Sequence, residues 1–486
     1  MNVAETVLAR FKVEFSAQVV SMIAGGVLTV LLARLLSPDE YGLLYLALAT
    51  LSVFALCSKL GLANAAAKYV TEYRETAPSQ VPHIVRLSLY YTVIAAILTA
   101  AGVLVFRDEI AALVGEPSLG PLLLIGTLFL ITTTLVGYLR TLLQGFEEIR
   151  RSSYLVMLSS LGKLGFALGL VLLGYGAVGA LVGHVVAYTI VICVGGIFLY
   201  STVQTYDVAT RVESGLRKRI LEYNVPIFFT RGSNVLDKQV DTILVGVFLT
   251  PVAVSYYVVS KQFVGFLQAP AAALGFTVSP TLGKQKAAND VAEAARMYES
   301  TIVHILLLYL PASAGIALTA RPAIEYTFGS AYLGAVPVLQ VLSWFILLQA
   351  IMQVTSTALD FLGRARVRAI AKGATALANV ALNVILIPEF GVVGAAVATV
   401  VTYTIYAGTN LYVIATEFPL RRGYILHQTL LITAVTGAMS AIVFFLRTYV
   451  ETPLTLAFLV TLGVAIWFTL SLVVGLIDLN EVKATI

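Results

Sequence analysis

The sequence predicts an all-α protein that crosses a membrane fourteen times. Of its 486 residues, 59% are hydrophobic and only 12% are charged. Soluble proteins carry about a quarter of their residues as Asp, Glu, Lys and Arg, so most of this surface is suited to lipid. The apolar runs are also long and continuous, whereas the strands of a membrane barrel are short and alternate between apolar and polar residues. We therefore expect membrane-spanning helices.

About 20 apolar residues cross the hydrocarbon core of a bilayer as a helix. Fourteen segments meet this requirement, at 15–34, 41–60, 84–106, 119–140, 154–174, 177–200, 223–249, 252–282, 299–320, 334–360, 369–387, 391–416, 425–446 and 454–477. The N-terminal residues contain charges and lack a short apolar core followed by a small-residue cleavage site. We therefore expect no cleaved signal peptide, and a first helix that is retained.

The distribution of positive charge tests this count and orients the chain. With the N-terminus in the cytoplasm, 23 of the 31 Lys and Arg residues fall in cytoplasmic segments and only 4 in outer loops. The other four lie within spans. One helix more or fewer would scramble the alternation beyond that point. The positive-inside rule therefore predicts that both termini are cytoplasmic.

A duplicated motif divides the chain into halves. Residues 176–190 (GAVGALVGHVVAYTI) and 391–405 (GVVGAAVATVVTYTI) share ten identities at an offset of 215. The two copies lie in the sixth and twelfth spans, an even number apart, so both run the same way through the membrane. We therefore expect two parallel six-helix lobes, as in transporters built from parallel repeats. The predicted domains are an N-lobe at 1–212, a C-lobe at 213–422 and two appended helices at 423–486.

Several segments resemble the polysaccharide and lipid-linked oligosaccharide flippases of the multidrug/oligosaccharidyl-lipid/polysaccharide exporter superfamily. ARLLSPDEYGLLYLA (33–47) and KLGLANAAAKYVTEYR (59–74) are similar to the junction of that family's first two helices and to the end of its second. YTFGSAYLGAVPVLQVLSW (326–344) resembles the entry to its tenth helix. ALNVILIPEFGVVGAAVATVVTYT (381–404) is the most specific match and resembles the join between its eleventh and twelfth helices.

The resemblance implies a function at the plasma membrane. A flippase of this family transfers a lipid-linked glycan from the cytoplasmic to the outer leaflet by alternating access. The expected substrate is a polyprenyl phosphate or diphosphate glycan, used to assemble a polysaccharide, an S-layer or a glycoprotein glycan. We expect a monomer, with glycan-assembly enzymes as associated proteins and no nucleic-acid partner.

Charged residues inside the spans mark the candidate site. An ionisable side chain in the hydrocarbon costs several kcal/mol and normally faces a cavity or a partner. At roughly 100° per residue, five polar residues of the span 223–249 fall within a stripe of about 120°, which we expect to line the space between the lobes. They are Arg231, Asn234, Asp237, Lys238 and Asp241. The aligned positions of the first span carry no charge, so we expect the substrate- and ion-binding groups to lie mainly in the second half of the chain.

The stripe has two possible roles. Arg231 and Lys238, with Asn234 beside them, are candidates to bind the phosphate of the lipid carrier, because guanidinium binds phosphate bidentately and ammonium supplies a point charge. Asp237 and Asp241, one turn apart, are candidates to bind a coupling proton or sodium ion. The alternative is that these charges only neutralise one another within the bilayer, and both roles can hold together.

Two single lysines within spans complete the candidate site. Lys163 lies well inside its predicted helix, and Lys261 lies near the start of another. Each would bind phosphate if it faces the cavity, although Lys261 could extend its ammonium to the outer surface. The sequence contains no Walker motif, no nucleophile with a base and no Cys/His cluster at metal spacing. We therefore expect a protein that is not an enzyme and that has no cofactor and no metal site.

Two other functions stay open. A cation-coupled antiporter of drugs or small solutes in the same superfamily would share the architecture. Four cations against two clear carboxylates within the spans favour an anionic substrate over that alternative. A glycan ligase or polymerase would normally carry large external loops with catalytic groups, and the outer loops of this chain are short.

Overall fold

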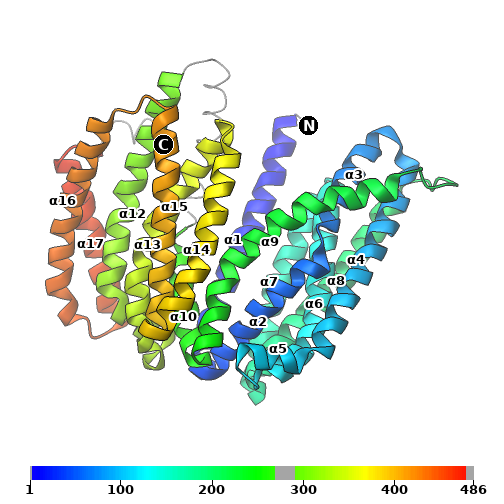
Figure 1. Ribbon diagram of the computed structural model, residues 1–486, viewed down its shortest axis with the longest axis horizontal. Coiled ribbons are helices and arrows are strands. Elements are labelled where there is room, and N and C mark those ends of the chain that lie inside the picture. Colours follow the sequence, from blue (N-terminus) through cyan, green and yellow to red (C-terminus); the bar gives the residue numbers. More distant parts are fainter. Residues whose placement is uncertain (1–2, 269–290, 478–486) are drawn as a thin grey trace. The chain divides into compact units, whose positions relative to one another are not determined.

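The computed structural model describes residues 3–268 and 291–477, with side chains except at 3–10, 225–227, 229–231, 233–234 and 361. Every regular element in these residues is a helix, which confirms the predicted all-α class. The chain divides into two compact units, Met1–Ser255 and Tyr256–Ile486. Figure 1 shows the helices of both, and each unit is described by itself below.

The first unit begins at the N-terminus and ends just after the start of α10. Its helices are α1 (Val3–Leu35), α2 (Pro38–Lys59), α3 (Leu62–Thr76), α4 (Val81–Val105), α5 (Arg107–Val114), α6 (Leu119–Gly145), α7 (Ile149–Leu170), α8 (Gly176–Val203) and α9 (Leu216–Phe248). A π-helical turn, Val171–Tyr175, joins α7 to α8. The core of the unit is formed by side chains of α3, α4, α6, α7, α8 and α9.

The second unit contains most of α10 and all later helices. They are α10 (Pro251–Phe266), α12 (Val291–Phe328), α13 (Val336–Phe361), α14 (Ala365–Phe390), α15 (Val392–Glu417), α16 (Arg422–Leu446) and α17 (Pro453–Val473). α12 packs against α13 and α16, and α13 packs against α15. The two appended helices of the sequence prediction, α16 and α17, lie against each other and against α12.

Eleven segments of the described residues are long and apolar enough to cross a membrane. One of them, Ile149–Val203, comprises both α7 and α8. α9 is as long as these helices but more polar, and residues 269–290, which include the end of one predicted span, lie outside the described residues. The protein is therefore a multi-pass membrane protein. The number of fourteen spans and the cytoplasmic placement of both termini stay predictions.

The boundary between the compact units differs from the boundary between the sequence repeats. α9 packs against α2 and α3 and belongs to the first unit, whereas the repeat register begins the second lobe at residue 213. The fit of α9 on α2 is close, since a Cβ atom at Gly246 would lie 2.5 Å from Leu46 Cδ1. The division into lobes at 1–212, 213–422 and 423–486 concerns the repeat and stays a prediction.

Both copies of the repeat start with the same backbone turn. Gly176, the first residue of α8, has φ 54° and ψ −144°, and Gly391, directly before α15, has φ 60° and ψ −146°. This conformation is open to glycine and strained for a residue with a Cβ atom. Each repeat then packs closely on the preceding helix. A Cβ at Gly183 would lie 2.4 Å from the Ala167 backbone, and one at Gly394 would lie 2.1 Å from a carbonyl oxygen of α14.

A backbone break follows α2 and separates it from α3. α2 ends at Lys59, and the next two residues, Leu60 and Gly61, have φ values of 41° and 75°. α3 then starts at Leu62. Left-handed backbone ends a right-handed helix, so the carbonyl end of α2 lies at Lys59. The negative end of the helix dipole favours a cation at this position.

The linker between α8 and α9 is fixed to α3 and to the start of α4. Tyr73 Oη donates a hydrogen bond to Glu213 Oε2 at 2.7 Å, and Arg219 Nη2 donates to Tyr73 Oη at 2.7 Å. Arg219 also forms an ion pair with Glu213. The bond from Tyr73 and the charge of Arg219 hold the pKa of Glu213 below its usual range. His83 and Gln80 bond to backbone carbonyl groups at residues 209 and 211 of the same linker.

An ion pair between a buried carboxylate and an exposed arginine joins α12 to the start of α16 within the second unit. Glu299 is 1% exposed. Its Oε1 accepts a hydrogen bond from the Arg421 backbone N–H at 2.5 Å, and its Oε2 accepts one from Arg421 Nε at 2.8 Å. A buried carboxylate is stable when it is paired and fully hydrogen-bonded. This contact therefore fixes the point at which the chain enters the appended helix pair.

Candidate functional site

The predicted polar stripe lies on α9 in the first unit. Asp241 is buried, with 4% of its surface exposed. Asp237 and Lys238, one turn earlier, are exposed. The side chains of Arg231 and Asn234 lie outside the described residues. The stripe's position between the lobes and the roles of its five residues stay predictions.

A pocket of about 250 Å³ lies between α2 and α9. Ser52, Leu56 and Lys59 line it from α2, and Phe228 and Val235 line it from α9. Among the side chains that the structure describes, Lys59 at the end of α2 is the one charged group in its lining. A cation beside an apolar wall in a membrane protein suits the anionic group of an amphipathic ligand.

Sequence reasoning missed Lys59. It ends the apolar run 41–60 and was counted with the cytoplasmic flank. The sequence signal for its place at the end of α2 is the following Leu60-Gly61 pair. This pair breaks a helix that would otherwise continue to Thr76. A glycine inside a long helical segment indicates a break or a close packing contact.

Lys163 lies in α7 with its ammonium 5.7 Å from the ring centroid of Tyr188 in α8. The Tyr188 ring contacts Phe129 of α6 at 5.9 Å between centroids. His184, one turn earlier on α8, bonds through Nδ1 to the Ala180 carbonyl oxygen at 2.7 Å. The lysine therefore lies against an aromatic group on the repeat helix, an arrangement that stabilises a cation away from water.

Two lysines of the second unit also lie over tyrosine rings. Lys261, on α10, is 5.2 Å from the centroid of Tyr257 one turn earlier. Lys372, on α14, is 4.8 Å from the Tyr403 centroid and 5.1 Å from that of Tyr406. Sequence reasoning selected Lys261 but assigned Lys372 to a cytoplasmic basic cluster. The structure places Lys372 eight residues into a helix of the spanning length.

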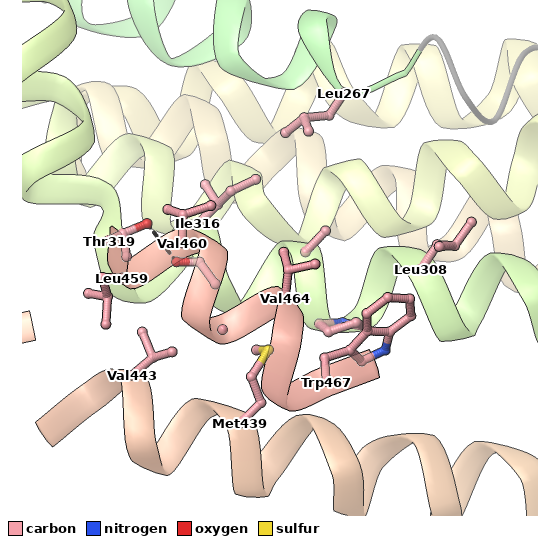
Figure 2. A pocket seen from close by; sticks show the side chains of 14 residues that line it. Leu267, Leu308, Ile316, Thr319, Met439, Val443, Leu459, Val460, Val464 and Trp467 are labelled. Atoms are coloured by element: carbon pink, nitrogen blue, oxygen red, sulfur yellow. Dashed lines mark hydrogen bonds between the residues drawn. The ribbon is translucent and has the colours of Figure 1, made fainter. Parts of the chain in front are cut away.

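An apolar pocket of about 360 Å³ lies between α12, α16 and α17 of the second unit (Figure 2). Ile316 on α12, Met439 on α16, and Val464 and Trp467 on α17 line its walls. Gly315 leaves space at the α12 side, because a Cβ atom there would meet nothing within 4 Å. The lining has few polar groups that need a hydrogen-bond partner, so the pocket suits a hydrocarbon chain.

The part of the chain that the structure describes contains no group of three or more His, Cys, Asp and Glu residues able to hold a metal ion. Charged side chains lie on several of its long helices, among them Lys59 on α2, Lys163 on α7 and Asp241 on α9. Together with the multi-pass helical fold, they define a membrane protein with charged groups along its long helices.

The chain belongs to the polysaccharide biosynthesis protein family, whose model matches residues 31–337. It is 28% identical over 165 residues to the probable low-salt glycan biosynthesis flippase Agl15 of Haloferax volcanii, covering 34% of this chain and 35% of that protein. It is 28% identical over 319 residues to the succinoglycan biosynthesis transport protein ExoT of Rhizobium meliloti, covering 64% and 60%. The matches thus span about a third and three fifths of these relatives' lengths.

The fold is similar to those of two solved membrane proteins. The lipid II flippase MurJ, in an inward closed conformation, matches with a TM-score of 0.78 and 16% identity over 94% of this chain and 97% of MurJ. An inward-facing multidrug resistance MATE family transporter of the MOP superfamily matches with a TM-score of 0.66 and 14% identity, over 82% and 95%. At these identities the likeness concerns the fold alone.

The family match confirms the resemblance to polysaccharide flippases and the prediction of a membrane transporter that is not an enzyme. It does not test the individual site residues. The roles of Lys163 and Lys261, like those of the stripe on α9, stay predictions.

Proposed function

We propose that this protein moves a lipid-linked oligosaccharide from the cytoplasmic to the outer leaflet by alternating access. The substrate is a glycan on polyprenyl phosphate or diphosphate, destined for a polysaccharide, an S-layer or a glycoprotein glycan. Membership of the polysaccharide biosynthesis family supports the proposal. Agl15 and MurJ, to which this chain is similar, are named as flippases, and this supports movement of a lipid-linked substrate between leaflets.

The observation that carries the proposal is that each unit, taken by itself, holds a pocket that suits one part of such a substrate. The pocket at Lys59 offers a cation next to apolar walls, and the pocket at Trp467 is almost wholly apolar. A lipid-linked glycan has an anionic phosphate and a long hydrocarbon chain. The phosphate cannot cross the hydrocarbon core without a compensating charge, because an isolated ion in a low dielectric is very costly. Cations on the membrane helices supply that charge.

The predicted phosphate ligand on α9 gives the first test. Arg231→Ala should abolish glycan export in cells while the protein stays folded and inserted. The matched control is Arg366→Ala on α14, which removes one exposed positive charge. Export is measured as surface glycan, together with the lipid-linked precursor retained inside spheroplasts. Normal export by Arg231→Ala would remove the phosphate-binding role from this residue.

A cation-coupled antiporter of drugs or small solutes is the second candidate. The similarity in fold to a MATE transporter and the buried carboxylate of Asp241 favour it. Both candidates are tested in vesicles with imposed proton or sodium gradients. In the flippase, Asp241→Asn should change the gradient dependence of lipid-linked glycan transfer. Drug uptake by the wild type without any glycolipid transfer would favour the antiporter.

Within the proposed function, the chain acts as a monomer in the plasma membrane and receives its substrate from glycan-assembly enzymes. The carrier lipid is distinguished by offering undecaprenyl-linked and dolichyl-linked glycans in separate vesicle preparations. Transfer of one and not the other identifies the carrier.

A further inference from the structure

We propose that α9 moves with the first unit during transport, and that the linker before it holds it there. The sequence repeat assigns α9 to the second half of the chain, but its contacts lie on α3 at its start and on α2 further along (Figure 1). The inference rests on the proposed function, because it concerns the alternating access of a flippase. It implies that the polar stripe of α9 belongs to the first of the two bodies that move.

The first turns of α9 are attached to α3. Tyr69 Oη donates a hydrogen bond to the carbonyl oxygen of Arg219 at 3.3 Å. The Lys68 ammonium lies 4.2 Å from the ring centroid of Tyr223, one turn later on α9, and the rings of Tyr69 and Tyr223 meet edge to face with centroids 6.1 Å apart. Leu216, the first residue of α9, is fully buried in the core of the first unit. Hydrogen bonding, cation–π contact and apolar burial therefore all hold this end of the helix.

The linker that leads into α9 is bonded at closely spaced points. The Ala209 N–H donates to the Ser79 carbonyl oxygen at 2.9 Å. Gln80 Nε2 donates to the Arg211 carbonyl oxygen at 2.8 Å, and Gln80 Oε1 accepts from the Glu213 N–H at 3.2 Å. The side chain of Glu213 adds the hydrogen bond and the ion pair described above. The linker therefore has little slack between residue 209 and the start of α9.

The other end of α9 is attached to α2. A Cβ atom at Gly246 would lie 2.5 Å from Leu46 Cδ1, so the two helices approach at a distance that only glycine permits. Directly after α9, the carbonyl group of Pro251 occupies the space that a Cβ atom at Gly42 would need. Two glycines, one on each helix, thus set the fit at this end.

A helix that is attached at both ends moves with the body that holds those ends. Separation of α9 from the first unit would expose Leu216, break the bonds of the linker and unpack Leu46 from Gly246 together. Packed interfaces change between discrete arrangements and do not stretch continuously. Asp237 and Asp241 therefore keep their position relative to α2 through the transport cycle, and the conformational change takes place elsewhere in the chain.

A reversible crosslink tests whether α9 separates from α2. Leu46→Cys and Gly246→Cys are combined in the full chain after the two exposed cysteines, Cys57 and Cys193, are replaced by Ala. The oxidised protein should transfer lipid-linked glycan in vesicles at a rate within about twofold of the reduced protein, because the crosslink leaves the barrier almost unchanged. Each single-cysteine chain, treated with the same oxidant, is the matched control. Loss of transfer in proportion to the crosslinked fraction, with recovery on reduction, would overturn the proposal.

Spin labels on exposed residues give a second readout, which does not depend on transfer. Arg217→Cys on α9 is paired either with Arg150→Cys on α7 of the first unit or with Arg366→Cys on α14 of the second. Added lipid-linked glycan and imposed proton or sodium gradients should change the second distance distribution and leave the first unchanged. Tyr73→Phe with Glu213→Gln should broaden the first distribution and lower transfer severalfold, because it removes the bonds of the linker.

The outcomes separate the inference from the proposed function. A change in the Arg217–Arg150 distribution with substrate or gradient, or a distribution that stays narrow when the linker bonds are removed, would overturn the inference. An Arg217–Arg366 distribution that stays the same under every condition would contradict alternating access, and with it the proposed function. Unfolding temperatures close to that of the wild type establish that the variants are folded. If the double variant unfolds, Tyr73→Phe alone retains the ion pair between Glu213 and Arg219.

Discussion

The Lys372 ammonium lies 4.8 Å from the ring centroid of Tyr403 in the second unit, and Tyr403 is the repeat counterpart of Tyr188. In the first unit, Lys163 lies 5.7 Å from the Tyr188 centroid. Each lysine comes from the helix directly before the repeat, yet the two lysines occupy different positions along it. The duplicated motif therefore carries the same cation–tyrosine contact in each half. The comparison of the charged stripe on α9 with the first span did not predict this contact.

A double-mutant cycle on Lys372 and Tyr403 tests this contact. Lys372→Met keeps the aliphatic stem and removes the charge, and Tyr403→Leu removes the ring. We expect a coupling free energy of about 0.5–2 kcal/mol, the range for cation–π pairs from exposed to desolvated sites. Reversible unfolding in mixed micelles supplies the four free energies. Strict additivity of the two single changes would show that the contact adds no stability.

Gly183 tests the close packing of the first repeat. Gly183→Ala places a Cβ atom 2.4 Å from the Ala167 backbone, so α7 and α8 must move apart. Overpacking of this kind costs about 1–3 kcal/mol, and we expect a lower unfolding temperature. Gly165→Ala on α7 is the matched control, because its Cβ would meet nothing within 4 Å. The control should be neutral or stabilise the helix by up to about 1 kcal/mol. Equal unfolding temperatures for the two variants would contradict the packing model.

The all-helical class and most of the long apolar helices could be predicted from sequence, because continuous apolar runs of about 20 residues favour membrane-spanning helices. The glycines of the repeat also predicted close helix packing, which the structure has at Gly183 and Gly394. Lys59 and Lys372 were missed for one shared reason. Each stands at the edge of an apolar window, where the positive-inside count assigns it to the cytoplasm. The ends of the helices differ from the edges of such windows, since α2 ends at Lys59 and α14 starts at Ala365.

The sequence also could not predict that α9 packs with the helices of the first compact unit. Its register within the repeat assigns it to the second half, but its contacts with α2 and α3 place it in the first compact unit. That packing depends on the fit of Leu46 against Gly246, residues 200 positions apart. No local pattern in the sequence records such a contact.

Glu213 makes the stability of the first unit depend on pH. Its pKa is held low in the folded protein by Tyr73 and Arg219, so its contribution is present above the usual pKa of a glutamate. That contribution is lost as the pH falls through the lowered value. We expect wild-type and Glu213→Gln proteins to differ in unfolding temperature at pH 7 and to converge as the pH falls below the usual pKa of a glutamate and through the lowered value. A difference that persists unchanged in acid would exclude the ionised carboxylate as its source.

Gly315 tests the apolar pocket. Gly315→Phe should fill the space between α12 and α17 and lower lipid-linked glycan transfer about tenfold, because the hydrocarbon chain loses its site. The fold should survive, since a Cβ atom at this position meets no neighbour. Gly437→Phe on α16 is the control, as it adds the same ring at an exposed position with equal space around its Cβ. Equal transfer rates for the two variants would remove the pocket from the transport cycle.

The matching turns at Gly176 and Gly391 bear on the history of the chain. Two glycines with nearly identical φ and ψ, 215 residues apart, indicate that this corner existed before the gene duplicated. The corner was then already part of the duplicated unit, at the start of the motif that both copies share. The lysines over the shared tyrosine occupy different positions in the two copies, so the charges of the two halves diverged after the corner was set.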